Sequence, residues 1–295
     1  MIVSKLYLCF MLMSGCAGDL SQSFEQSLTI ITPQRIDFAE INYYAIRSKS
    51  AYDPIDDIRR AFPLTTHAVT IKSVNVRYFI ETDLINNRQT LTVRGTAVKQ
   101  NVWEDIETTL VPDSILGIPL HRGFQRDATA IFDDSISHIR KDMPLHITGH
   151  SLGGAVAMIL AAYYDKRGYK VARLVTFGQP KFTSEPPPEK VLSVTTRVVN
   201  DLDVVPMIPP HTLARPYEHF SSEIILRDGS DFVFLDEHDA KRISVGDFWR
   251  NITDFSLKEH HMDDYLSNIK GKAEIGSRQI PYLFKRETKA VVGIN

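Results

Sequence analysis

The sequence predicts an α/β fold in which a mostly parallel central sheet is flanked by helices on both faces. Segments typical of strands alternate with segments typical of helices along most of the chain, which indicates parallel strands. Two short segments, residues 145–148 and 171–177, are rich in leucine, isoleucine or valine and suit buried strands. With 295 residues, of which 43% are hydrophobic, the chain is long enough for one large core.

The predicted elements follow this order along the chain. Apolar residues at helical spacing predict a first helix over about residues 36–61. Residues 69–82 and 89–93 alternate as two strands do, and Asn86 and Asn87 between them suit a turn. The remaining elements are a helix over 129–140, a strand over 145–148, a helix over 152–164, strands over 171–177 and 196–200, a hairpin over 224–234 about Asp228 and Gly229, and a helix near 262–269.

The charge balance excludes one class of partner. The formal net charge is -2, so there is no basic surplus to neutralise the phosphates of a nucleic acid. No apolar run reaches the length that spans a bilayer. We therefore expect no nucleic-acid partner.

The N-terminal segment predicts export and a lipid anchor. Lys5 precedes a short apolar stretch, the layout of a secretory signal over residues 1–15. The signal ends at Ser-Gly-Cys-Ala, which resembles the lipobox of bacterial lipoproteins and implies lipidation of Cys16, although Met13 stands where leucine is usual. Ala17 favours the outer membrane of the cell envelope. Residues 16–35 are then a polar tether before a domain over 36–295; an ordinary cleaved signal is the alternative.

A Gly-x-Ser-x-Gly pattern lies between a predicted strand and a predicted helix. It consists of Gly149, His150, Ser151, Leu152 and Gly153. In the nucleophile elbow of α/β-hydrolase folds, this pattern presents the serine hydroxyl on a sharp, strained turn. Glycines flank it because the strand and the helix approach too closely for a Cβ atom. The pattern predicts that Ser151 is a hydrolytic nucleophile.

A serine nucleophile needs a base and a carboxylate that orients the base, in the chain order Ser, Asp or Glu, His. Residues 200–210 have the sequence Asn-Asp-Leu-Asp-Val-Val-Pro-Met-Ile-Pro-Pro. Their pattern Asn-x-x-Asp-x-Val-Pro-x-x-Pro resembles the acid segment of the class 3 lipases, the fungal triacylglycerol lipase-like family. The resemblance implies the α/β-hydrolase fold, with Asp203 as the acid. Asp201, out of register with the pattern, is the local alternative.

The base is sought among the histidines that follow Asp203. Residues 259–266 have the sequence Glu-His-His-Met-Asp-Asp-Tyr-Leu, which resembles the segment of the same family that carries its histidine before a helix with a tyrosine. The register His-x-Met-x-x-Tyr-Leu implies His260, and His261 remains the alternative. The adjacent histidines point in different directions and lack the ligand spacing of a zinc site, so we expect no metal.

The oxyanion of the reaction needs hydrogen-bond donors. Residues 91–96 end in Arg-Gly-Thr, which resembles the family's oxyanion strand and implies Thr96 as one donor. The backbone N–H of Leu152, at the positive end of the elbow helix, is the other. Residues 97–106, with Trp103, correspond to the family's lid region or form an ordinary surface helix. His121 lies in a His-x-Gly-Phe segment that resembles a structural motif of the family.

The resemblance covers about residues 36–270 and implies a serine ester hydrolase that acts on lipid acyl esters without a cofactor. Triacylglycerol, phospholipid and lysophospholipid substrates all suit an anchored enzyme. Soluble feruloyl-type esters and acyl transfer use the same triad and are the alternatives. A non-catalytic envelope lipoprotein that keeps the fold for binding is the alternative from another class.

Overall fold

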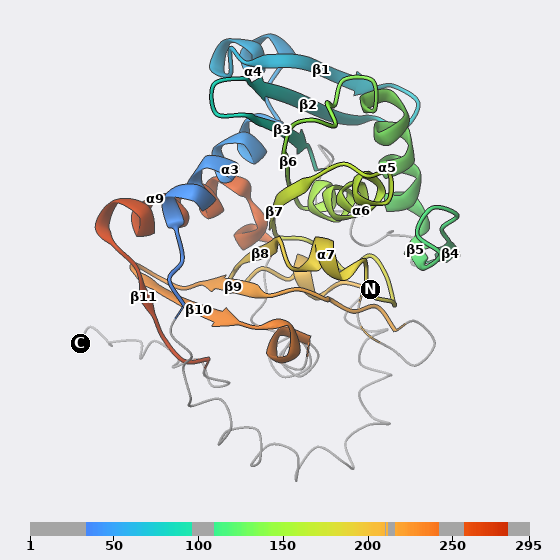
Figure 1. The fold of residues 1–295 in the computed structure, drawn as a ribbon. Coiled ribbons are helices and arrows are strands. Elements are labelled where there is room, and N and C mark those ends of the chain that lie inside the picture. The colour runs from blue at the N-terminus through green and yellow to red at the C-terminus, as the bar shows by residue number, and fades with distance from the viewer. Residues whose placement is uncertain (1–33, 96–108, 210, 212–215, 242–256, 283–295) are drawn as a thin grey trace, which may run out of the picture.

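A computed structural model describes residues 34–95, 109–209, 211, 216–241 and 257–282 of the protein. Within these ranges a nine-stranded sheet crosses the molecule in the order β1-β2-β3-β6-β7-β8-β9-β10-β11 (Figure 1). Its strands are β1 (Thr65–Ile71), β2 (Val76–Asp83), β3 (Arg88–Val93), β6 (Leu145–His150), β7 (Val171–Phe177), β8 (Thr195–Asn200), β9 (Glu223–Leu226), β10 (Asp231–Leu235) and β11 (Arg278–Gln279).

The centre of the sheet is parallel. Within the series β3-β6-β7-β8-β9, each strand pairs in parallel with the next. The antiparallel β1-β2-β3 meander forms one edge. At the other edge, β10 pairs antiparallel with β9, and the last strand, β11, pairs in parallel with β10. Because parallel strands end at the same edge, the segments after β6, β7 and β8 meet there. The predicted mostly parallel sheet is confirmed.

Helices cover both faces of this sheet, as the sequence predicts. Leu145 and Ile147 of β6 belong to the apolar cluster of α5 (Arg122–Ser135) and α6 (Leu152–Lys166). The intervening residues face α3 (Phe38–Ser50): His146 contacts Tyr44 there, and Thr148 contacts Ser48. This alternation follows from the two-residue repeat of a strand. Helix α9 (Met262–Ile275) packs beside α3, and the short α7 is Glu189–Leu192.

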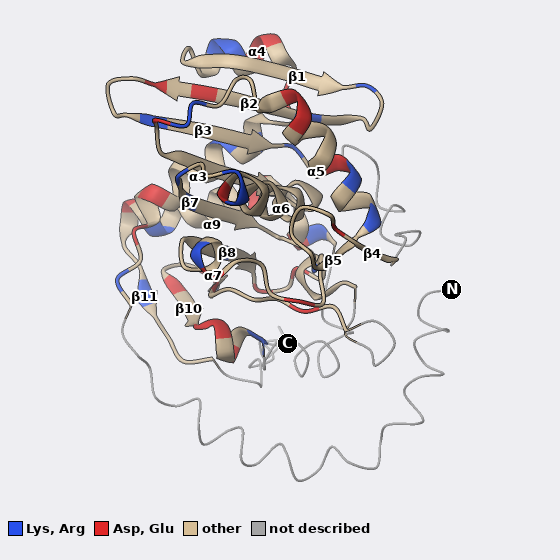
Figure 2. Ribbon diagram, turned by 45° about the vertical axis from the view of Figure 1, so that its right-hand side comes forward, with Lys and Arg blue, Asp and Glu red and all other residues tan. Residues whose placement is uncertain are grey.

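Charged residues lie mainly on the helices, the edge strands and the connections (Figure 2). Figure 2 shows lysines and arginines interspersed with acidic residues across the described segments. None of the described helices combines the length and the apolar character needed to cross a bilayer.

The predicted N-terminal elements were partly wrong. The helix expected over residues 36–61 is two helices, α3 and α4 (Ile55–Ala61), because Pro54 disfavours helical backbone at the residue before it. The strand expected over 69–82 is the β1–β2 hairpin, with Asn75 at φ 53° in its turn. The helix expected from residue 129 begins at Arg122, where His121 Nδ1 accepts a 3.3 Å bond from the Phe124 N–H.

Other elements agree with the prediction or add to it. The β9–β10 hairpin turns at Gly229, whose φ is 63°, as expected from residues 228–229. A second small sheet pairs β4 (Leu110–Pro112) with β5 (Pro119–His121), and single-turn helices η2 (Val205–Met207) and η3 (Lys258–His260) follow later in the chain. Several predicted segments lie outside the described residues: the signal, the tether except for residues 34 and 35, and the whole lid region. Cys16, Thr96 and Trp103 lie outside them as well.

Candidate active site

Ser151 lies at the turn between β6 and α6 in a strained backbone conformation. Its φ of 60° and ψ of -134° fall outside the regions that serine ordinarily adopts. The Ser151 N–H donates a 2.8 Å bond to the carbonyl of Phe177, which fastens the turn to the end of β7. Such strain persists only where the surrounding structure imposes it, so the fold holds this serine on a sharp turn.

The close approach of β3, β6 and α6 requires glycine in the elbow. A Cβ atom on Gly153 would lie 2.5 Å from the carbonyl oxygen of Val93, and one on Gly149 would lie 2.4 Å from the oxygen of Gly153. Gly95 lies directly against the serine, since a Cβ atom there would be 3.0 Å from Ser151 Cβ. The end of β3 therefore adjoins the elbow.

Asp203 and His260 form a buried pair. The His260 Nδ1–H donates a 2.7 Å hydrogen bond to Asp203 Oδ2, and the Tyr265 hydroxyl donates a 2.6 Å bond to the same oxygen. The Val205 N–H donates to Oδ1 at 2.8 Å. Asp203 is fully buried, so these three donors take the place of solvent around its carboxylate.

The two alternative residues occupy other positions. Asp201 forms an ion pair with Arg227. His261 is exposed and is the residue just before α9. Asn200 donates a 3.1 Å bond to the carbonyl of Glu259, which ties the end of β8 to the segment that carries His260. The structure thus brings Asp203 and His260 together.

Gly178 joins these groups to the elbow. It follows β7 directly after Phe177, with a φ of 54°. A Cβ atom there would lie 2.8 Å from His260 Cε1 and 2.9 Å from Asp203 Oδ2, so only glycine fits. Ser151 after β6, Gly178 after β7 and Asp203 after β8 meet at the carboxyl edge of three neighbouring parallel strands.

The predicted oxyanion donors are placed in part. Leu152 is the first residue of α6, where backbone N–H groups lack intrahelical partners and the helix dipole is positive. Thr96 lies outside the described residues, one position beyond Gly95. Arg94 holds the backbone there, since its Nη2 donates a 2.9 Å bond to the Asn75 carbonyl.

Sequence reasoning assigned no role to His150 or Tyr52, and both contact the site. The Tyr52 hydroxyl lies 2.8 Å from His150 Nδ1, and His150 Nε2 lies 2.9 Å from the carbonyl oxygen of His260. The rings of His150 and His260 are 4.6 Å apart. Burial holds the pKa of His150 well below its ordinary value, and repulsion from His260 adds to this effect.

Two more buried basic residues support the segment after Asp203. Lys181 Nζ donates a 3.1 Å bond to the carbonyl of Met207, and His219 Nε2 donates a 2.8 Å bond to that of Pro206. The Lys181 backbone N–H donates to Ile208 O at 2.9 Å. Burial lowers the pKa of Lys181 to about 7. Three successive carbonyls are thereby fixed.

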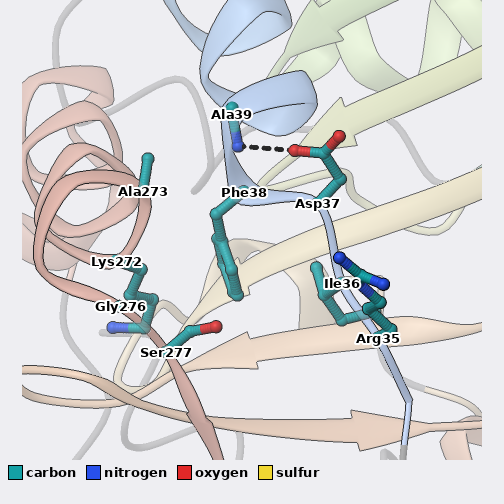
Figure 3. Close-up of a pocket in the computed structure, with 9 residues that line it drawn as sticks. All are labelled: Arg35, Ile36, Asp37, Phe38, Ala39, Lys272, Ala273, Gly276 and Ser277. Carbon is teal, nitrogen blue, oxygen red and sulfur yellow. Dashed lines mark hydrogen bonds between the residues drawn. The ribbon is translucent and has the colours of Figure 1, made fainter.

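A pocket of about 400 Å³ lies elsewhere, between the first residues of α3 and the last residues of α9 (Figure 3). Phe38 and Lys272 are among its lining residues, whereas Tyr52, which contacts His150, follows the opposite end of α3. The cavity is therefore separated from Ser151 by the length of α3, about 20 Å. Among the described residues, Asp236, His238 and Asp239 form a group with metal-ligand spacing, and none of these belongs to the Ser151 site.

Comparisons with known proteins agree with this geometry. Residues 90–213 match the family described as Lipase (class 3). The chain is 27% identical over 183 residues to a secreted mono- and diacylglycerol lipase of Fusarium solani, covering 59% of this chain and 54% of that protein. It is 34% identical over 121 residues to the toxin TseL of Vibrio cholerae, covering 38% of this chain and 18% of the toxin.

The fold comparison covers more of the chain. Lipase II from Rhizopus niveus superimposes with a TM-score of 0.63 at 18% identity, covering 76% of this chain and 92% of that structure. The chain spans about half or less of the length of the curated relatives named above. The matched residues include the nucleophile elbow and the acid segment, and the fold is the α/β-hydrolase fold. Residues 90–213 of the protein are thus similar to the class 3 lipase family.

Proposed function

We propose that the protein is a serine carboxylic-ester hydrolase that acts on lipid acyl esters. Ser151 Oγ attacks the ester carbonyl carbon, and His260 accepts the serine proton and then delivers it to the alcohol leaving group. Asp203 orients the imidazole and stabilises the imidazolium that forms. Water then attacks the acyl-enzyme with His260 again as the base, which releases the carboxylic acid and restores Ser151.

The observation that supports this proposal most strongly is the arrangement of three adjacent strand ends. A buried aspartate and a histidine joined at 2.7 Å flank Gly178, and the residue before Gly178 accepts a bond from the strained Ser151. Such a set supplies a nucleophile, a base and an orienting acid. The N–H of Leu152, together with Thr96, would stabilise the oxyanion, each donor contributing about 3–4 kcal/mol.

Lipid esters are the favoured substrate class because one similar protein is named as a mono- and diacylglycerol lipase. Rates on mono-, di- and triacylglycerol, phospholipid and lysophospholipid, all of one acyl chain, would identify the head group. Preference for a soluble feruloyl ester would instead indicate a feruloyl-type esterase. Transfer of the acyl group to an added alcohol in place of water would indicate an acyltransferase. Both would use the same triad.

The central test is labelling of the serine. A fluorophosphonate probe should react with the wild-type protein and not with Ser151→Ala, which should also lose p-nitrophenyl ester hydrolysis while keeping its melting temperature. Ser193→Ala, at an exposed serine after α7, is the matched control and should behave as wild type. Normal turnover by Ser151→Ala would refute the proposal.

We also propose that Cys16 is lipidated and anchors the protein in the cell envelope, in the outer membrane where the host has one. The support is the sequence of residues 1–17, in which a short signal-like segment runs into Ser-Gly-Cys-Ala. Cys16→Ser should abolish labelling by a fatty-acid analogue and release the protein from the membrane fraction. Unchanged membrane association of this variant would contradict the anchor.

A further inference from the structure

His150 is the residue before the nucleophile, and it is buried between two elements that the reaction requires. Its Nδ1 lies 2.8 Å from the Tyr52 hydroxyl, and its Nε2 lies 2.9 Å from the carbonyl oxygen of His260. Because a carbonyl only accepts, His150 Nε2 carries the proton. Its Nδ1 then accepts from Tyr52, so the two contacts together select one tautomer of a neutral imidazole.

Tyr52 also brings this chain of hydrogen bonds to the end of β3. Its hydroxyl lies directly against Gly95, since a Cβ atom on that glycine would be only 2.3 Å from the Tyr52 oxygen. Tyr52 and His150 donate in the same direction, from the Tyr52 hydroxyl to His150 and from His150 to the carbonyl of His260. Hydrogen bonds aligned in this way strengthen one another. The chain joins the strand end before Thr96, the elbow and the loop of the base.

The charge of His150 matters because its ring is only 4.6 Å from that of His260. A protonated His150 would oppose the imidazolium that forms on His260 during the reaction. The groups that face His150 are Tyr52 after α3, Tyr265 of α9, and the cationic or titratable His260, His261 and Lys49. None of these carries a negative charge that would favour protonation of His150.

The geometry points to His150 as a positioning residue that holds the base, the nucleophile and the oxyanion strand in one register through its neutral Nε2–H tautomer. The inference rests on the proposed ester hydrolysis. His150 touches no reacting atom in this scheme. It acts through the backbone of His260, and it keeps that imidazole beside Asp203 and the elbow.

Two substitutions separate its hydrogen bonds from its volume. His150→Phe retains a ring and removes both hydrogen bonds. We expect kcat to fall about 10- to 100-fold, because a displacement of a catalytic group by up to ~1 Å has an effect of this size. The KM for a p-nitrophenyl ester should be nearly unchanged. His150→Gln offers an amide NH2 donor group and a carbonyl acceptor, and it should restore most of the loss. Tyr52→Phe should reduce kcat less, and adding it to His150→Phe should have no further effect.

The chain offers a matched control. His146 lies four residues earlier on the same strand, and its Nδ1 lies 2.6 Å from the Tyr44 hydroxyl of α3. His146→Phe removes the same kind of Tyr–His contact away from Ser151. It should lower the melting temperature and leave kcat near the wild-type value. A structural role alone would make the two His→Phe variants alike in kcat.

Nitrogen-15 NMR of the wild-type protein tests the tautomer without any variant. His150 should show a protonated Nε2 and an unprotonated Nδ1, unchanged between about pH 5 and 8. Titration of His150 in that range, or full kcat in a folded His150→Phe, would overturn the inference. Failure of the proposed function would instead appear as wild-type protein without esterase turnover or serine labelling.

Discussion

Tyr265 donates a 2.6 Å hydrogen bond to Asp203 Oδ2, the same carboxylate oxygen that His260 Nδ1 contacts at 2.7 Å. The tyrosine is fully buried on α9, and burial raises the pKa of its hydroxyl well above its ordinary value, so it remains a donor at any physiological pH. Asp203, the proposed acid, is thus held by the helix that follows His260, the proposed base.

Removing that hydroxyl should impair the reaction. In Tyr265→Phe we expect kcat to fall about tenfold, because a less firmly oriented Asp203 raises the activation free energy by roughly 1.4 kcal/mol. We also expect the free energy of unfolding to fall by about 1.5–3 kcal/mol. Steady-state kinetics and denaturant unfolding measure the two effects. Tyr164→Phe removes a buried hydroxyl that contacts Ser135 and is the control. Equal kcat in both variants would count against the role of Tyr265.

The second prediction concerns the elbow. Gly153→Ala places a Cβ atom against backbone atoms of Val93 and Arg94, at 2.5 and 2.7 Å, and no side-chain rotation relieves that contact. We expect a loss of about 1–3 kcal/mol in the free energy of unfolding and loss of fluorophosphonate labelling. Gly271→Ala in α9 meets nothing within 4 Å and should instead stabilise by about 0.5–1 kcal/mol. An active, stable Gly153→Ala protein would contradict this prediction, since it would show that β3 and α6 can move apart to make room for the Cβ atom.

The third prediction concerns acid. Burial lowers the pKa of His146 from its ordinary 6.5 to about 4, with Arg88 and Arg173 adding to the effect. The unfolded chain therefore binds a proton at a higher pH than the folded protein does. The stability that this neutral histidine contributes is complete above pH 6.5 and is lost as the pH falls toward 4.

The variant His146→Phe removes this linkage. Its free energy of unfolding should fall less steeply than that of wild type between pH 6.5 and 4, measured by denaturant titration at several pH values. His150 and His219 have pKa values lowered in the same direction, so part of the slope should remain. Parallel curves for wild type and His146→Phe would contradict the assignment.

The parallel core was predictable because its elements carry local patterns. The strand over Val171–Phe177 is a mostly apolar segment with glycine directly after it, and the elbow is defined by two glycines, Gly149 and Gly153, on either side of Ser151. The β1–β2 turn was missed because its segment contains no glycine or proline and the alternation continues through it. Asn75 supplies the left-handed residue instead.

The network around the base could not be predicted in the same way. His150 meets Tyr52 and His260 across 98 and 110 residues of sequence, and no local spacing reports such contacts. The same holds for Lys181, whose side chain reaches Met207 in the interior. A lysine in a polar stretch gives no sign of burial before the tertiary structure is known.

The position of His260, the proposed base, on η3 just before α9 ties activity to a helix that packs against α3 rather than to a strand of the sheet. Ser151 and Asp203 follow strands in the middle of the sheet, whereas His260 depends on a helix that lies on its surface beside α3. Partial detachment of α9 would silence the protein while the parallel strands stay intact. On heating, loss of turnover should therefore precede loss of the sheet, and the temperature of inactivation would report the docking of one helix.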